Sequence, residues 1–120
     1  MADRIEVKSH DHPDETRTPN KTRAEIVHVG PLALGRLTLQ PGWRWSECIK
    51  PVAKTESCQV HHVGHAVSGS ITVRLENGNQ ATIKAGDSYD IPPGHDAWVD
   101  GSESFVCIEV QSAEQFAKPS

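Results

Sequence analysis

The chain has 120 residues, a net charge of −4 and a hydrophobic fraction of 36%, which fits one domain with a modest core. Its basic residues are scattered, so nucleic acid and an anionic membrane surface are excluded as main partners. No apolar run approaches the roughly 18 residues that span a bilayer, and the N-terminus lacks the apolar centre of a signal peptide. We therefore expect a soluble, cytoplasmic protein whose three cysteines form no disulfide framework.

Residues 1–22 are polar and charged, contain two prolines and show no hydrophobic periodicity. This composition predicts an N-terminal arm that is disordered or packs on a partner surface. The single domain is then expected to span residues 23–120.

Short apolar stretches alternate with glycine, proline and asparagine from Glu25 onward. Residues 70–75 alternate polar and apolar side chains and run into Asn77-Gly78, a strong hairpin pattern. Glycines at positions 69, 78, 86, 94 and 101 recur every seven to nine residues, a spacing typical of an all-β sandwich or barrel. Ser112–Gln115 has the form of a capping box, which predicts one short C-terminal helix.

A pair of tryptophans flanks Arg44 in an expected strand, where Trp43 and Trp45 share one face. Together with Tyr89 and Trp98 they are candidates for the walls of a ligand cavity, in which aromatic surface supplies most of the affinity. The alternative is packing in the core or in a dimer interface.

Three histidines lie within five residues, at positions 61, 62 and 65. A helix here would resemble the zinc-protease pattern, but His62 stands in the place of the general-base glutamate and the neighbouring valines and glycine favour a strand. In a strand, His62 shares a face with Cys58, while His61 and His65 point the other way and lie roughly 7 Å apart. One ion cannot bind all three, and His62 is the inward candidate.

Two groups of glycine and proline residues stand at motif spacing: Gly42 and Gly69 in the first, and Gly86, Pro92 and Gly94 in the second. On these residues the chain resembles a cupin from about residue 37 to residue 110. Asn77-Gly78 stands where the family has the hairpin between its two motifs. The resemblance implies an all-β double-stranded β-helix, or jelly-roll barrel, that holds a metal ion or a small molecule inside.

The metal ligands of the family are altered in this chain. One register of the first motif places Cys48 at the first histidine ligand, and another starts at Glu56 and places Cys58 at the second. Both place His62 at the family's glutamate ligand. In the second motif an alanine replaces the histidine, and His95 lies two residues earlier.

A metal site built from Cys48, Cys58, His62 and His95 has soft ligands, which favour zinc over iron, manganese or nickel. The alternative is a barrel without metal, in which His62 is a hydrogen-bonded histidine and the two cysteines fill the core, as we expect for Cys107.

Three functions follow from this pattern. The first is a metal-dependent enzyme (a dioxygenase, isomerase or lyase) that acts on a small organic molecule in the barrel. The second is a non-catalytic module that binds a small effector and signals through its N-terminal arm. The third is metal-free acid–base catalysis by His62 or His95. The resemblance also implies a homodimer, and Val63 and Val67 on the outer face are candidates for its interface.

Overall fold

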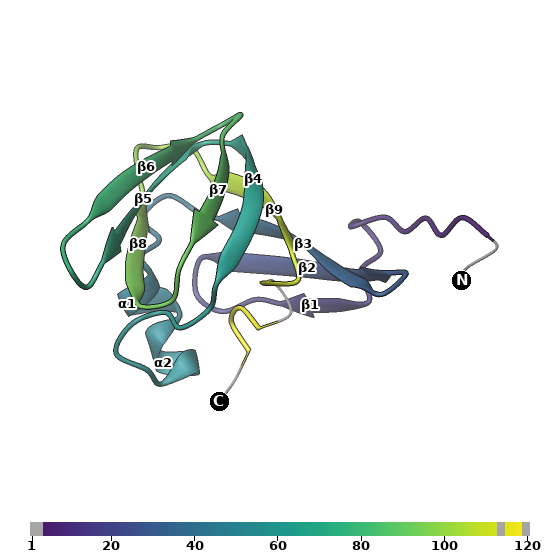
Figure 1. The fold of residues 1–120 in the computed structure, drawn as a ribbon, viewed down its shortest axis with the longest axis horizontal. Coiled ribbons are helices and arrows are strands. Elements are labelled where there is room, and N and C mark those ends of the chain that lie inside the picture. Colours follow the sequence, from purple (N-terminus) through teal and green to yellow (C-terminus); the bar gives the residue numbers. More distant parts are fainter. Residues whose placement is uncertain (1–3, 113–114, 119–120) are drawn as a thin grey trace.

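The computed structural model describes residues 4–112 and 115–118 of the chain. Within these residues the regular secondary structure is mainly β-strand, with two helices of one turn each (Figure 1). The strands are β1 (Glu15–Arg17), β2 (Thr22–Val29), β3 (Leu32–Leu39), β4 (His62–Ser68), β5 (Ser70–Leu75), β6 (Gln80–Lys84), β7 (Ser88–Ile91), β8 (His95–Val99) and β9 (Phe105–Val110). The helices are α1 (Trp45–Cys48) and α2 (Lys50–Ala53).

The strands form two antiparallel sheets that enclose the core. The larger sheet has the order β1-β2-β3-β9-β4-β7, and the smaller sheet has the order β6-β5-β8. Figure 1 shows the smaller sheet at the end of the larger one that carries β4 and β7. The predicted all-β, double-stranded β-helix architecture is confirmed.

Strict alternation of side chains decides which residues reach the interior. On β8, His95, Ala97 and Val99 are buried and the residues between them are partly exposed. On β9, Phe105, Cys107 and Glu109 are buried in the same way. A site inside the barrel is therefore built from every second residue of these strands.

The predicted hairpin at Asn77-Gly78 is confirmed. It joins β5 and β6, which pair from Ser70 with Lys84 to Arg74 with Gln80. Gly78 has a φ of +93°, a backbone conformation that favours glycine.

The predicted N-terminal arm is corrected at residues 15–17. These residues form β1, which pairs with residues 24–26 of β2. Nearer the N-terminus, Arg36 donates hydrogen bonds to the Asp11 carboxylate (2.9 Å) and to the His10 carbonyl oxygen (3.3 Å). The sequence pattern missed β1 because this short edge strand buries no apolar side chain.

The strand expected over Trp43 and Trp45 is also corrected. Helix α1 begins at Trp45, and the Cys48 and Ile49 backbone N–H groups donate to the carbonyl oxygens of Arg44 and Trp45. A single turn is too short to show helical periodicity in the sequence. Both tryptophans are nevertheless buried.

The predicted C-terminal helix at Ser112–Gln115 includes residues 113 and 114, which lie outside the described residues. Among the described residues, neither helix has the length or the apolar character needed to cross a membrane.

Gly64 of β4 allows β9 and β7 to approach on both sides. A Cβ atom at this position would lie 2.5 Å from the Ile108 carbonyl oxygen and 2.8 Å from the Tyr89 hydroxyl. We expect Gly64→Ala to lower the free energy of unfolding by about 3 kcal/mol, since overpacking displaces backbone. Gly78→Ala is the control, because its Cβ meets nothing within 4 Å and only the left-handed backbone costs about 1–2 kcal/mol. Urea unfolding measures both, and equal losses would contradict this account of the packing.

Candidate metal centre

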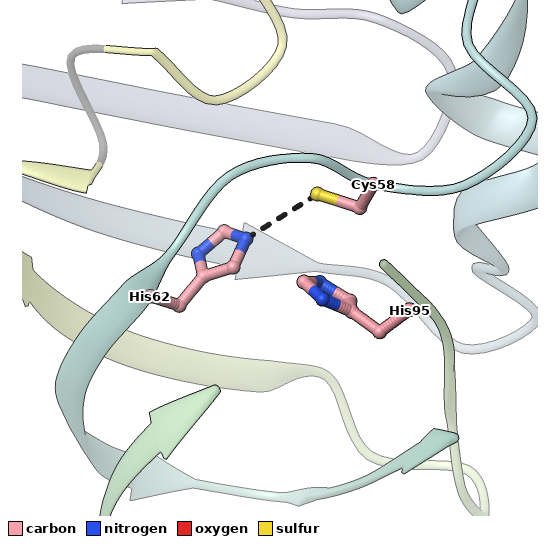
Figure 2. Close-up of side chains that lie close together, drawn as sticks. All are labelled: Cys58, His62 and His95. Carbon is pink, nitrogen blue, oxygen red and sulfur yellow. Dashed lines mark hydrogen bonds between the residues drawn. The ribbon is translucent and has the colours of Figure 1, made fainter. Parts of the chain in front are cut away.

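Three side chains with metal-ligating atoms meet inside the barrel. Cys58 lies in the segment before β4, His62 begins β4, and His95 begins β8 (Figure 2). Cys58 and His95 form an isolated bridge in which the Cys58 N–H donates to the His95 carbonyl oxygen at 2.8 Å. Cys58, His62 and His95 are exposed by 2%, 5% and 3%, respectively. Backbone pairing thus brings the loop cysteine to two strand histidines.

The spacing of the three ligating atoms fits one metal ion. The Cys58 Sγ atom lies 3.5 Å from His62 Nε2, and the ligating atoms of all three residues lie within 4.8 Å of one another. Two ligands of a tetrahedral zinc ion, with Zn–S of about 2.3 Å and Zn–N of about 2.0–2.1 Å, are roughly 3.3–3.6 Å apart. The Cys58–His62 pair already has this separation, so the group can hold a metal.

Each imidazole has its second nitrogen fixed by an oxygen. His62 Nδ1 lies 2.7 Å from Glu109 Oε1, and His95 Nδ1 lies 2.8 Å from the Pro92 carbonyl oxygen. Because a carbonyl oxygen only accepts, His95 Nδ1 carries a proton, and its Nε2 is the nitrogen that can bind a metal. The Glu109 carboxylate accepts a hydrogen bond from the Nδ1–H group of His62 in the same way. Metal-binding histidines in proteins show this pattern of outer-shell acceptors.

Glu109 is the centre of a buried hydrogen-bond network. Its carboxylate accepts hydrogen bonds from the Tyr89 hydroxyl at 2.7 Å and the Ser112 hydroxyl at 2.8 Å, besides its contact with His62. Every buried side-chain nitrogen and oxygen in the described residues has a hydrogen-bond partner. Glu109 is therefore held in one orientation from three directions.

Burial and charge act against each other in this network. Burial opposes the ionised form of Glu109, but the charge and hydrogen bond of His62 keep the pKa of Glu109 below its usual range. Burial likewise opposes the charged form of His62, yet the Glu109 carboxylate raises the pKa of His62. For Cys58, burial opposes ionisation, but hydrogen bonds and positive charge from His62 and His95 lower the pKa of the thiol to about 6. Tyr89 stays a neutral donor, because burial and the neighbouring carboxylate raise its pKa.

No family model and no curated protein matches the sequence. Solved structures match over nearly the whole chain. A protein of unknown function from Rhizobium leguminosarum has a TM-score of 0.64 at 18% identity, over 98% of this chain and 99% of its own. KdgF from Halomonas has a TM-score of 0.58 at 19% identity, over 86% of this chain and 87% of its own.

A protein with a double-stranded β-helix domain from Klebsiella pneumoniae has a TM-score of 0.58 at 22% identity. The match covers 87% of this chain and 86% of that protein. The chain has the double-stranded β-helix fold. At these identities the likeness establishes the fold alone, and the chemistry of the chain has to be argued from its own site.

The chain brings three of the four predicted metal ligands together. Cys48 is the exception: it is the last residue of α1, is buried there, and has its Sγ atom 3.9 Å from the Asn20 side-chain nitrogen. Among the described residues, the group that can hold a metal contains Cys58, His62 and His95 but not Cys48. The geometry therefore fits the motif register that starts at Glu56.

The structure places the three clustered histidines on the faces that the strand interpretation predicted. His62 points inward, whereas His61, immediately before β4, and His65, on the outer face of β4, are exposed. The exposed rings contact β7: His61 Nε2 lies 2.6 Å from Asp90 Oδ1 and His65 Nδ1 lies 2.9 Å from Ser88 Oγ.

The four predicted wall residues do not all reach the interior. Trp43, Trp45 and Tyr89 line a cavity of about 40 Å³ together with His62 and His95. Trp98 lies on the outer face of β8, with the Arg44 guanidinium carbon 4.6 Å from its ring centroid. The prediction for Trp98 is wrong because residues 95 and 98 of one strand cannot share a face.

The sequence interpretation missed Glu109 as a functional residue. In the sequence, Glu109 only interrupts the apolar run Phe105–Val110. The parity of the strand was the available clue, since Phe105, Cys107 and Glu109 occupy alternate positions and an acidic side chain on a core face needs a partner.

The electrostatics of the site predict an acidic thiol. In metal-free protein we expect the alkylation rate of Cys58 to rise with pH around a midpoint of about 6, because the lowered pKa makes the thiolate dominant above that pH. Residue-resolved mass spectrometry of iodoacetamide adducts gives the profile. Cys107 is the internal control, because burial and Glu109 raise its pKa. A midpoint for Cys58 near the ordinary thiol value of about 8.5 would contradict the described hydrogen bonds.

Proposed function

We propose that Cys58, His62 and His95 bind a divalent metal ion, preferably zinc, and that the protein is an enzyme acting on a small organic molecule. One observation carries this proposal: both imidazoles are fixed through Nδ1, and the ligating atoms of the three residues lie within 4.8 Å of one another. Three protein ligands leave one position for water or substrate, as in catalytic zinc sites.

The donor set narrows the reaction class. Zinc has no redox chemistry, so a thiolate–imidazole site favours isomerase, lyase or hydrolytic chemistry over dioxygenation. When bound, the ion would polarise a substrate oxygen or acidify a water molecule. The protein's own residues prepare the site: Glu109 orients His62, Tyr89 holds Glu109, and the tryptophan walls limit the entry of water.

The volume of the interior bounds the size of the substrate. The cavity of about 40 Å³ is far below the roughly 300–1,000 Å³ of pockets for drug-sized ligands. It has room for about three water molecules. The substrate class is therefore a small molecule, and a larger one requires a wall residue to move.

A second candidate is metal-free cysteine chemistry. His62 lies between the other two residues: its Nε2 is 3.5 Å from Cys58 Sγ, and its Nδ1 is 2.7 Å from Glu109 Oε1. This order of nucleophile, base and orienting carboxylate is that of enzymes with a cysteine nucleophile. The same residues serve both candidates, so metal content distinguishes them.

Metal analysis of the purified protein tests the proposal. We expect about one zinc ion per chain by inductively coupled plasma mass spectrometry, and loss of that ion in His62→Ala, His95→Ala and Cys58→Ser, because each removes one of three ligands. Cys48→Ala and His61→Ala are matched controls that keep the metal.

Two results would contradict the proposal. If the folded protein contains no metal and binds no zinc on incubation, the metal site is ruled out. Cysteine chemistry and the non-catalytic binding module would then remain as candidate functions. Equal zinc content in His62→Ala and wild type would place the ion elsewhere. Protein that retains a small molecule unchanged after incubation would favour the binding module.

Homodimer formation and a cytoplasmic location stay predictions from the sequence. Val63 and Val67, the expected interface residues, are exposed by 43% and 54% on the outer face of β4.

A further inference from the structure

Phe116 separates two spaces around the candidate metal centre. The inner cavity of about 40 Å³ is lined by His62 and His95, and an outer groove of about 100 Å³ is lined by Cys58. Phe116 and Trp45 line both spaces. The imidazoles therefore lie on the cavity side of the Phe116 ring. Cys58 lies on the groove side, where the same ring bounds the space beside the thiol.

The Phe116 ring packs directly on a candidate ligand. Its centroid lies 5.7 Å from the His62 ring in an edge-on arrangement and 6.5 Å from the Trp43 ring. The residue is only 3% exposed, although it lies near the end of the chain. Its side chain closes the route between the groove and the imidazoles.

Among the described residues, two hydrogen bonds to its backbone hold Phe116 in place. Arg17 of β1 donates a hydrogen bond from Nη1 to the Phe116 carbonyl oxygen at 2.7 Å, and the Phe116 N–H donates to the Ser112 carbonyl oxygen at 3.1 Å. The next residue, Ala117, has a φ of +59°, which is unusual for a residue with a Cβ atom. Besides these hydrogen bonds, burial of the Phe116 ring holds this residue in place.

We propose that Phe116 determines which molecules reach the site. With the ring in place, the interior admits only molecules of a few heavy atoms. When the ring is displaced, the groove and the cavity join into one space that reaches from the surface past Cys58 to His62 and His95. The identity of the site as a metal centre rests on the proposed function, but access to Cys58 does not depend on metal.

The test measures access in metal-free wild type, Phe116→Leu and Phe116→Ala. Residue-resolved mass spectrometry follows iodoacetamide alkylation of Cys58 at a fixed pH. We expect the alkylation rate of Cys58 to increase from wild type through Phe116→Leu to Phe116→Ala, because thiol reactivity depends on exposure. The rate in Phe116→Ala should be about tenfold that of wild type. Phe105→Leu is the matched control: Phe105 lines the inner cavity but not the groove, and we expect the wild-type rate.

A second variant covers the case in which Phe116→Ala does not fold. Arg17→Gln removes the guanidinium tether and leaves the core side chains unchanged, so Cys58 should again react faster than in wild type. Circular dichroism identifies folded variants. Equal alkylation rates of Cys58 in wild type and in folded Phe116→Leu and Arg17→Gln would overturn the inference.

Extraction of zinc by a chelator separates this inference from the proposed function. If the protein holds zinc, we expect faster extraction from Phe116→Leu than from Phe105→Leu. If it holds no zinc, the proposed function fails, and the alkylation series alone decides whether Phe116 controls access. Zinc extracted at equal rates together with unchanged alkylation would overturn the role of Phe116 while leaving the metal site intact.

Discussion

The buried contact between Glu109 and His62 is the interaction on which the site depends. Glu109 lies on β9, between β3 and β4 in the larger sheet, and its carboxylate reaches His62 at the start of β4. Removing one partner of a buried charged pair costs about 3–5 kcal/mol, because the other charge is left without compensation. Tyr89 and Ser112 also donate hydrogen bonds to the Glu109 carboxylate. One network therefore stabilises the interior and fixes which nitrogen of His62 faces Cys58.

This constraint explains why two chemistries are compatible with one geometry. A metal centre and a cysteine nucleophile both need an imidazole whose Nδ1 is held, so that Nε2 points at the sulfur. Figure 2 shows His62 turned toward Cys58, with His95 beside the pair. The second imidazole favours the metal, because a nucleophile–base pair needs one histidine whereas a zinc site gains its third ligand from His95. In the proposed enzyme, the residues that close the small interior would select the substrate.

Much of this arrangement could be predicted from the sequence, and the failures have physical reasons. Strand parity correctly turned His62 inward, and the same rule would have excluded Trp98 and found Glu109, had it been applied to β8 and β9. The choice between Cys48 and Cys58 was beyond the sequence, since Cys58 reaches the site from a loop whose path is set by its bridge to His95. Phe116 was beyond it too, because its burial results from packing between distant parts of the chain.

The zinc affinity of Glu109→Gln tests the central claim most directly. Competition with a chromophoric chelator gives the dissociation constant, with Glu103→Gln, a change at an exposed position, as the control. If Glu109 fixes the orientation and basicity of His62, the glutamine variant should bind zinc about 10- to 100-fold more weakly, while the control matches wild type. Equal affinities for Glu109→Gln and wild type, both folded, would contradict the account.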